Sequence, residues 1–145
     1  MNEQKKRLFV IKIAYWLGIG ADALWAVGLL VPQVFGMLST GSPGFHPDVQ
    51  TRLIMGIGAS LMTGWTFLLV WAVRKPIERR GVILLTAFPV VFGLFIVAFI
   101  GFLGGNTWNL WILIKSTILI ISMVTSYLLA GKMDKKEIDS QTRIS

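Results

Sequence analysis

Four long apolar stretches constrain the fold of this chain more than any other feature of its sequence. They cover residues 8–30, 53–73, 82–103 and 108–130. Each is close to the roughly 20 residues that an α-helix needs to cross about 30 Å of hydrocarbon. A helix satisfies its own backbone hydrogen bonds there, and the alternating pattern of a membrane β-barrel is absent from the sequence. The stretches therefore predict an all-α membrane protein, an up-down bundle of four transmembrane helices.

The composition agrees with one membrane-spanning domain. Of the 145 residues, 54% are hydrophobic and only 14% are charged, and the mean hydropathy is +0.71. A soluble chain normally carries about a quarter charged residues. The length suits one domain rather than two. We therefore expect residues 1–145 to form a single transmembrane domain, with a polar tail at residues 132–145.

Proline and glycine mark the breaks between these stretches. Pro32 predicts the end of the first helix or a kink in it, and the Gly/Pro-rich residues 41–47 predict a loop. Residues 104–107 predict an uncharged turn before the last helix. Pro89 lies inside the third stretch, where it removes one backbone hydrogen bond and predicts a kink.

The distribution of positive charge predicts the orientation of the helices. Eleven of the fourteen Lys and Arg residues precede the first stretch, separate the second from the third, or follow the fourth, and only Arg52 lies on the opposite side. The eleven are Lys5, Lys6, Arg7, Arg74, Lys75, Arg79, Arg80, Lys132, Lys135, Lys136 and Arg143. Cytoplasmic loops carry such an excess of positive charge. We therefore expect a multi-pass protein of a prokaryotic cytoplasmic membrane with both termini in the cytoplasm, in contact with the lipid bilayer.

Two ionisable residues fall inside the predicted spans, where an unpaired charge costs several kcal/mol. Asp22 lies about 21 Å from the cytoplasmic end of the first span, and Lys115 lies about 22 Å from the same end of the fourth, at 1.5 Å per residue. This matching depth predicts an ion pair that fixes the packing of the two helices. Two alternatives remain open: Asp22 is a proton or substrate site, or Lys115 reaches the outer interface.

Small residues at helical spacing predict the faces that pack or line a cavity, because they allow helices to approach closely. These candidates are Gly18, Gly56, Ser60, Gly64, Ser122 and Ser126. Trp16, Trp25 and Trp65 lie deep in the spans, where each indole N–H requires a partner. They are candidates for an aromatic pocket around Asp22, although packing against neighbouring helices or lipid also explains them.

The sequence contains no pattern typical of a catalytic or cofactor site. The chain has no cysteine, and its single histidine, His46, lies in the predicted outer loop. This excludes haem held by histidines within the helices and gives no clustered ligands for a metal. No nucleophile–base pair can be assembled. We therefore expect no cofactor and no metal, and the basic segments suit anionic lipid headgroups better than nucleic acid.

Three classes of function follow from these residues. The first is a non-enzymatic accessory or structural membrane subunit that acts through helix contacts, with a homo-oligomer or another membrane protein as partner. The second is an oligomeric transporter or channel protomer that moves a small solute or proton past Asp22. The third is a membrane-embedded enzyme acting on a lipid or quinone, and the residues favour it least.

Overall fold

The computed structural model describes residues 3–42 and 44–142, without the side chains of Thr40 and residues 134–142. This part of the chain is helical and contains no strand. Its helical segments are α1 (Glu3–Leu30), α2 (Pro32–Thr40), α3 (Val49–Ala72), α4 (Arg80–Leu85), the π-helical η1 (Thr86–Val91), α5 (Phe92–Leu103) and α6 (Asn109–Thr142). The last residues of the predicted tail, including Arg143, lie outside the described range.

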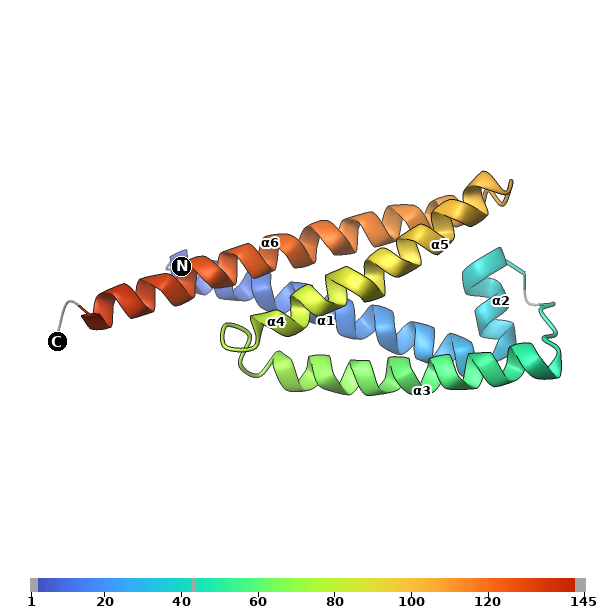
Figure 1. Ribbon diagram of the computed structural model, residues 1–145, viewed down its shortest axis with the longest axis horizontal. Coiled ribbons are helices and arrows are strands. Elements are labelled where there is room, and N and C mark those ends of the chain that lie inside the picture. The colour runs from blue at the N-terminus through green and yellow to red at the C-terminus, as the bar shows by residue number, and fades with distance from the viewer. Residues whose placement is uncertain (1–2, 43, 143–145) are drawn as a thin grey trace.

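Four helices are long and apolar enough to cross a membrane, which confirms the four predicted stretches. They are Glu3–Leu30, Val49–Ala72, Arg80–Leu103 and Asn109–Met133. The third consists of α4, η1 and α5 in succession. Successive long helices run in opposite directions, and both ends of the chain lie at the same end of the molecule as the turn between α3 and α4 (Figure 1).

The core lies nearer that end of the molecule. Its largest fully buried side chains include Tyr15 and Ile11 of α1, Leu69 of α3, Ile83 of α4 and Met123 of α6. Helix α1 packs against both α3 and α6, and α5 packs along α6. Toward the other end, α5 and α6 diverge from α1 and α3 (Figure 1). The tight packing is therefore at one end, and the opposite half of the molecule is more open.

Helix α2 is an element that the sequence pattern did not predict. Pro32 does end α1, as expected, but it also occupies the first turn of α2, where its missing N–H costs no helical hydrogen bond. Gly41 ends α2 in the left-handed conformation, with φ +71°, and its N–H bonds to the carbonyl of Gly36. A glycine adopts that conformation without steric cost. The connection from α1 to α3 is therefore a short helix followed by a loop.

The predicted kink at Pro89 is present and includes a π-helical segment. Phe88, the residue before the proline, has φ −101° and ψ 149°, outside the helical region. The proline ring clashes with a preceding helical residue, which pushes that residue toward extended geometry. The Thr86 hydroxyl donates to the carbonyl of Val82 at 2.8 Å and accepts a hydrogen bond from the Trp65 indole at 3.0 Å. One side chain thus connects the kink to α3.

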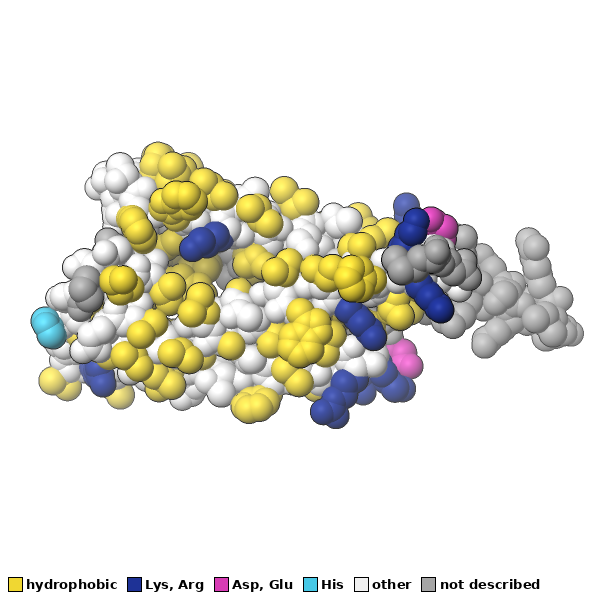
Figure 2. All heavy atoms as spheres, turned by 180° about the vertical axis from the view of Figure 1, so that it is seen from behind, with side chains coloured by type: hydrophobic (Ala, Val, Ile, Leu, Met, Phe, Trp, Pro, Cys, Tyr) yellow, Lys and Arg dark blue, Asp and Glu magenta, His cyan; other side chains and the backbone are white. Residues whose placement is uncertain are grey.

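Positive side chains gather toward the end that holds the termini, and hydrophobic side chains cover much of the face between the ends (Figure 2). At that end, the turn between α3 and α4 contacts both α1 and α3 through Arg79. The Tyr15 hydroxyl donates to the carbonyl of Arg79 at 3.0 Å, and the Arg79 guanidinium lies 3.5 Å from the centre of the Trp71 ring. Lys75 and Glu78 form an exposed ion pair at 3.0 Å.

Candidate functional site

Asp22 is buried where α1 meets α3, η1 and α6. Its side chain lines a cavity of about 40 Å³ together with Met62, Val91, Leu119 and Met123. The residue is only 5% exposed, and Oδ2 has no hydrogen-bond partner among the described residues. Asp22 is the only ionisable residue that lines this cavity. The carboxyl group therefore lies in an almost entirely apolar environment.

The predicted ion pair between Asp22 and Lys115 is not formed. Within the described part of the chain, the only carboxylate–ammonium pairs are Lys6 with Glu3 and Lys75 with Glu78. The cause is the register of the two helices. Gly18 of α1 faces Met123 of α6 so closely that an added Cβ would lie 2.8 Å from the Met123 side chain.

One turn further along α1, Asp22 shares its cavity with Leu119, and Lys115 lies a further turn toward the start of α6. The depth estimate from the sequence was therefore about one helical turn in error. The buried side of α6 contains Ser116, Met123, Ser126 and Ala130, and Lys115 is an exposed residue at the edge of that side.

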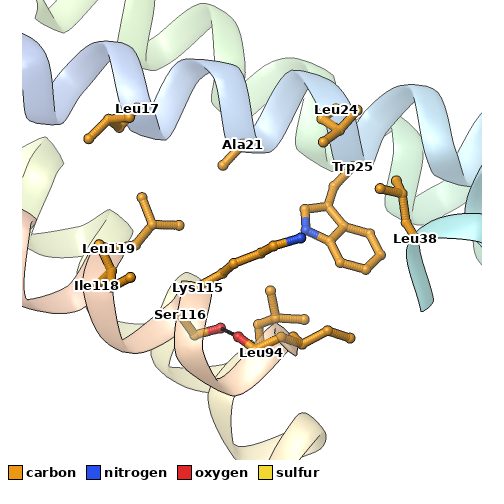
Figure 3. Close-up of a pocket in the computed structure, with 11 residues that line it drawn as sticks. Leu17, Ala21, Leu24, Trp25, Leu38, Leu94, Lys115, Ser116, Ile118 and Leu119 are labelled. Carbon is orange, nitrogen blue, oxygen red and sulfur yellow. Dashed lines mark hydrogen bonds between the residues drawn. The ribbon is translucent and has the colours of Figure 1, made fainter. Parts of the chain in front are cut away.

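Lys115 instead extends into a second cavity, of about 290 Å³, between α1, α2, α5 and α6. Figure 3 shows its side chain pointing in the direction of Trp25. The other lining residues are almost all apolar: Leu17, Ala21, Leu24, Leu38, Leu94, Ile112, Ile118 and Leu119, with Ser116. The Ser116 hydroxyl already has a hydrogen-bond partner, because it donates to the carbonyl of Ile112 at 2.8 Å. Lys115 therefore provides the only charge in the cavity.

The Lys115 cavity opens sideways between α1 and α6. Leu17, Leu24 and Ile118 line the cavity and are also 48%, 51% and 59% exposed on the surface of the molecule. The opening of the cavity is therefore bordered by exposed apolar side chains.

A third and larger cavity, of about 440 Å³, adjoins the second. Trp25, Leu94 and Ile112 line both of them. Ser39 of α2 and Asn109 of α6 contribute polar side chains, and the remaining lining is apolar apart from Gly101. The two cavities occupy the half of the molecule in which α5 and α6 diverge from α1 and α3.

Helix α2 and the turn before α6 meet at the end of the molecule opposite the α3–α4 turn (Figure 1). The indole N–H of Trp108 donates to the carbonyl of Leu38 at 3.2 Å. The Trp108 ring also packs on Gly41, where an added Cβ would lie 3.0 Å from ring atoms. Since Leu38 itself lines the Lys115 cavity, this contact fixes α2 beside the cavity mouth.

The small residues divide into an inward and an outward group. Gly18 is buried at the contact between α1 and α6, Ser126 is fully buried and Ser122 is half-buried. Gly56, Ser60 and Gly64 instead lie on an exposed face of α3, and an added Cβ at either glycine would meet no atom within 4 Å. Their spacing indicated a common face, but it could not show whether that face is inside or outside.

The three deep tryptophans also take different places. Trp25 lines all three cavities described above, including the one that contains Asp22. Trp65 donates its N–H to Thr86 and packs against the core. Trp16 is 60% exposed and lines none of the three.

Sequence reasoning missed the contribution of α2 and α5 to the site. Leu38 and Phe35 of α2 and Leu94 of α5 line the cavities, yet each is one apolar residue among many in the sequence. For α2, the combination of Pro32 at the start and Gly41 after the end was an available signal. For Leu94 no local signal exists, because its role depends on how the helices diverge.

Comparison with known proteins gave no match: no protein-family model, no curated protein sequence and no solved structure is significantly similar to this chain. A function can therefore be proposed only from the chemistry of the site. The cavities offer a large apolar volume, one ammonium group and a separate buried carboxyl group. This arrangement suits the binding of a hydrophobic molecule.

Proposed function

We propose that this protein is an integral membrane protein that binds a lipophilic molecule between α1, α2, α5 and α6 without transforming it. The observation that carries the proposal is the adjoining pair of cavities of about 290 and 440 Å³ with apolar linings. Small-molecule sites are commonly clefts of roughly 300–1,000 Å³ with mostly hydrophobic linings and a few polar groups. The lateral opening between α1 and α6 supports entry from the bilayer.

The proposal includes the membrane and the orientation expected from the sequence. Both termini and the basic α3–α4 turn lie at one end of the molecule (Figure 1). Positive residues favour the cytoplasmic side. We therefore place both termini in the cytoplasm, in a four-helix bundle of the cytoplasmic membrane. In this orientation α2 and Trp108 lie at the opposite, outer side.

Filling the shared wall of the cavities tests the proposal. Leu94 lines all three cavities, so Leu94→Trp places an indole where the ligand would lie. Leu128→Trp is the matched control, because Leu128 is 58% exposed on α6 and lines none of them. The probes are dioleoylglycerol and dioleoylphosphatidylglycerol, added to protein in a neutral detergent. Native mass spectrometry measures how many probe molecules each protein retains.

We expect the wild-type chain and Leu128→Trp to retain one probe molecule each, and Leu94→Trp to lose it. The loss should be about tenfold or more in affinity, since the apolar contacts of an acyl chain contribute about 0.8 kcal/mol per buried methylene. Equal binding by all three proteins would contradict a site between these helices, and so would the failure of the wild-type chain to bind either lipid.

A role as an accessory subunit that binds another membrane protein is a second candidate, because α3 has an exposed face of small residues. Gly56, Ser60 and Gly64 form this face, and small residues at this spacing allow a second transmembrane helix to approach closely. If the purified protein carries no lipophilic molecule and instead co-migrates with a membrane protein, the accessory role is favoured over lipid binding.

A further inference from the structure

The charge in the Lys115 cavity has no partner in the described part of the molecule. Lys115 makes no ion pair or hydrogen bond with any described residue, and the buried carboxyl of Asp22 lies in a different cavity. Along α6, Lys115 lies six residues after Asn109, about 9 Å from the start of the helix at 1.5 Å per residue. Lys115 is exposed at the lateral opening of this apolar cavity, and an ammonium group without a partner inside a bilayer is costly. This cost falls if an anion binds to the group.

The residues around the ammonium group indicate which chemical groups the bound anion must contain. Leu17, Leu24 and Ile118 line the cavity and are partly exposed at its opening, whereas Leu94 and Leu119 lie deeper. An ion with no hydrophobic part would lose its hydration there and gain only one partner. An amphiphile gains the contact with Lys115 and also buries its chain against the leucine side chains.

We propose that Lys115 binds the anionic group of an amphiphile whose acyl chain occupies the cavity between α1, α2 and α6. This inference rests on the proposed function and adds the chemical class of the ligand to it. The Lys115 side chain extends toward Trp25 and Leu38, at the α2 side of the cavity (Figure 3). The anionic group therefore lies beside α2, and the chain extends along Leu94 toward the larger cavity. Basic pockets between transmembrane helices bind lipid headgroups in the same manner.

Two sources share this chemistry, namely the phosphodiester of a phospholipid and the carboxylate of a free fatty acid. Three probes separate them in neutral detergent by native mass spectrometry. Dioleoylphosphatidylglycerol carries a phosphodiester, oleate carries a carboxylate, and dioleoylglycerol has the same two chains as the phospholipid without a charge. If the site takes a phosphodiester, we expect dioleoylphosphatidylglycerol to bind the wild-type chain about tenfold or more tightly than dioleoylglycerol, the size of one charge-assisted hydrogen bond. If it takes a carboxylate, we expect oleate to bind the wild-type chain about tenfold or more tightly than the Lys115→Met chain. Comparing the two dioleoyl lipids tests a phosphodiester site without any substitution in the protein.

Substitution of the lysine tests the residue itself. Lys115→Met retains an unbranched side chain and removes the charge, so it should abolish the preference for the anionic probe while dioleoylglycerol binding stays within about twofold. Lys115→Arg keeps the charge and should keep the preference. Lys12→Met is the matched control, because Lys12 is an exposed lysine within α1 that lines none of the three cavities. It should bind all three probes as the wild-type chain does.

The outcomes distinguish this inference from the proposed function. If every probe binds, Leu94→Trp reduces binding, and Lys115→Met leaves the relative affinities unchanged, then the role of Lys115 is wrong and the lipophile site stands. Equal affinity of the wild-type chain for all three probes leads to the same conclusion. If the wild-type chain binds none of them, both proposals are overturned.

Discussion

At the scale of single residues, the close approach of Gly18 to Met123 marks the register of α1 on α6 on which the chemistry of the site depends. In this register, Asp22 lies beside Leu119 rather than beside Lys115. Two charges that the sequence places at one depth are separated by about one helical turn. Asp22 and Lys115 therefore do not pair: Asp22 is a buried carboxyl group, and Lys115 is an ammonium group that lines a cavity.

Substitution of this glycine should be far more costly than substitution of its neighbour. Gly18→Leu forces a large side chain against Met123 and Leu69, where even a Cβ lies 2.8 and 3.4 Å from their atoms. We expect it to lower the free energy of unfolding in detergent by about 1–3 kcal/mol, the usual cost of overpacking. Gly20→Leu on the same helix meets no atom within 4 Å at its Cβ and should be neutral or stabilising. Similar stabilities of the two variants would contradict the close approach of α1 and α6.

At the scale of helices, the third span shows how a local rule and a distant contact combine. Pro89 and the extended geometry of Phe88 interrupt the helix, as the sequence predicted. The sequence did not reveal that Thr86 in this segment would accept a hydrogen bond from Trp65, 21 residues earlier on α3. This hydrogen bond gives the partly buried indole N–H a partner, which a buried tryptophan usually requires.

Removing the Thr86 hydroxyl should therefore destabilise the contact between η1 and α3. Thr86→Val keeps the shape of the side chain but leaves the Trp65 N–H without its acceptor, which should cost about 1–3 kcal/mol in thermal or denaturant unfolding. Thr66→Val is the control, because the Thr66 hydroxyl donates only to the carbonyl of Met62 in its own helix. It should change stability by less than about 0.5 kcal/mol. Thr86→Ser should resemble the wild-type chain.

At the scale of the whole molecule, the helices are packed at one end and diverge at the other (Figure 1). The buried core of Tyr15, Leu69, Ile83 and Met123 holds the first half together. In the second half, α2 and Trp108 connect the diverging helices around the two larger cavities. The shape therefore combines a buried core with a cavity that has an apolar lateral opening, which is the physical basis of the proposed function.

The proposed orientation can be checked by labelling, because the chain contains no cysteine. Thr107→Cys lies in the exposed turn before α6, and Glu78→Cys lies in the turn between α3 and α4. We expect a membrane-impermeant maleimide to label Thr107→Cys in intact bacterial cells and to label Glu78→Cys only after the membrane is permeabilised. The reverse pattern would show that the orientation is inverted. Equal labelling of both sites in intact cells would exclude a single topology.

Features that depend on local physics could be predicted from the amino-acid sequence alone. Long apolar stretches give four helices, Pro32 ends α1, and Pro89 bends the third span, because backbone geometry and hydrophobicity act over a few residues. The tertiary structure decided the features that depend on register and divergence. A shift of one turn separated Asp22 from Lys115, the rotation of α3 left Gly56 and Gly64 outside, and the splaying of α5 opened the cavities. Local sequence does not encode the register, rotation or divergence of the helices, because each depends on how side chains of different helices pack against one another.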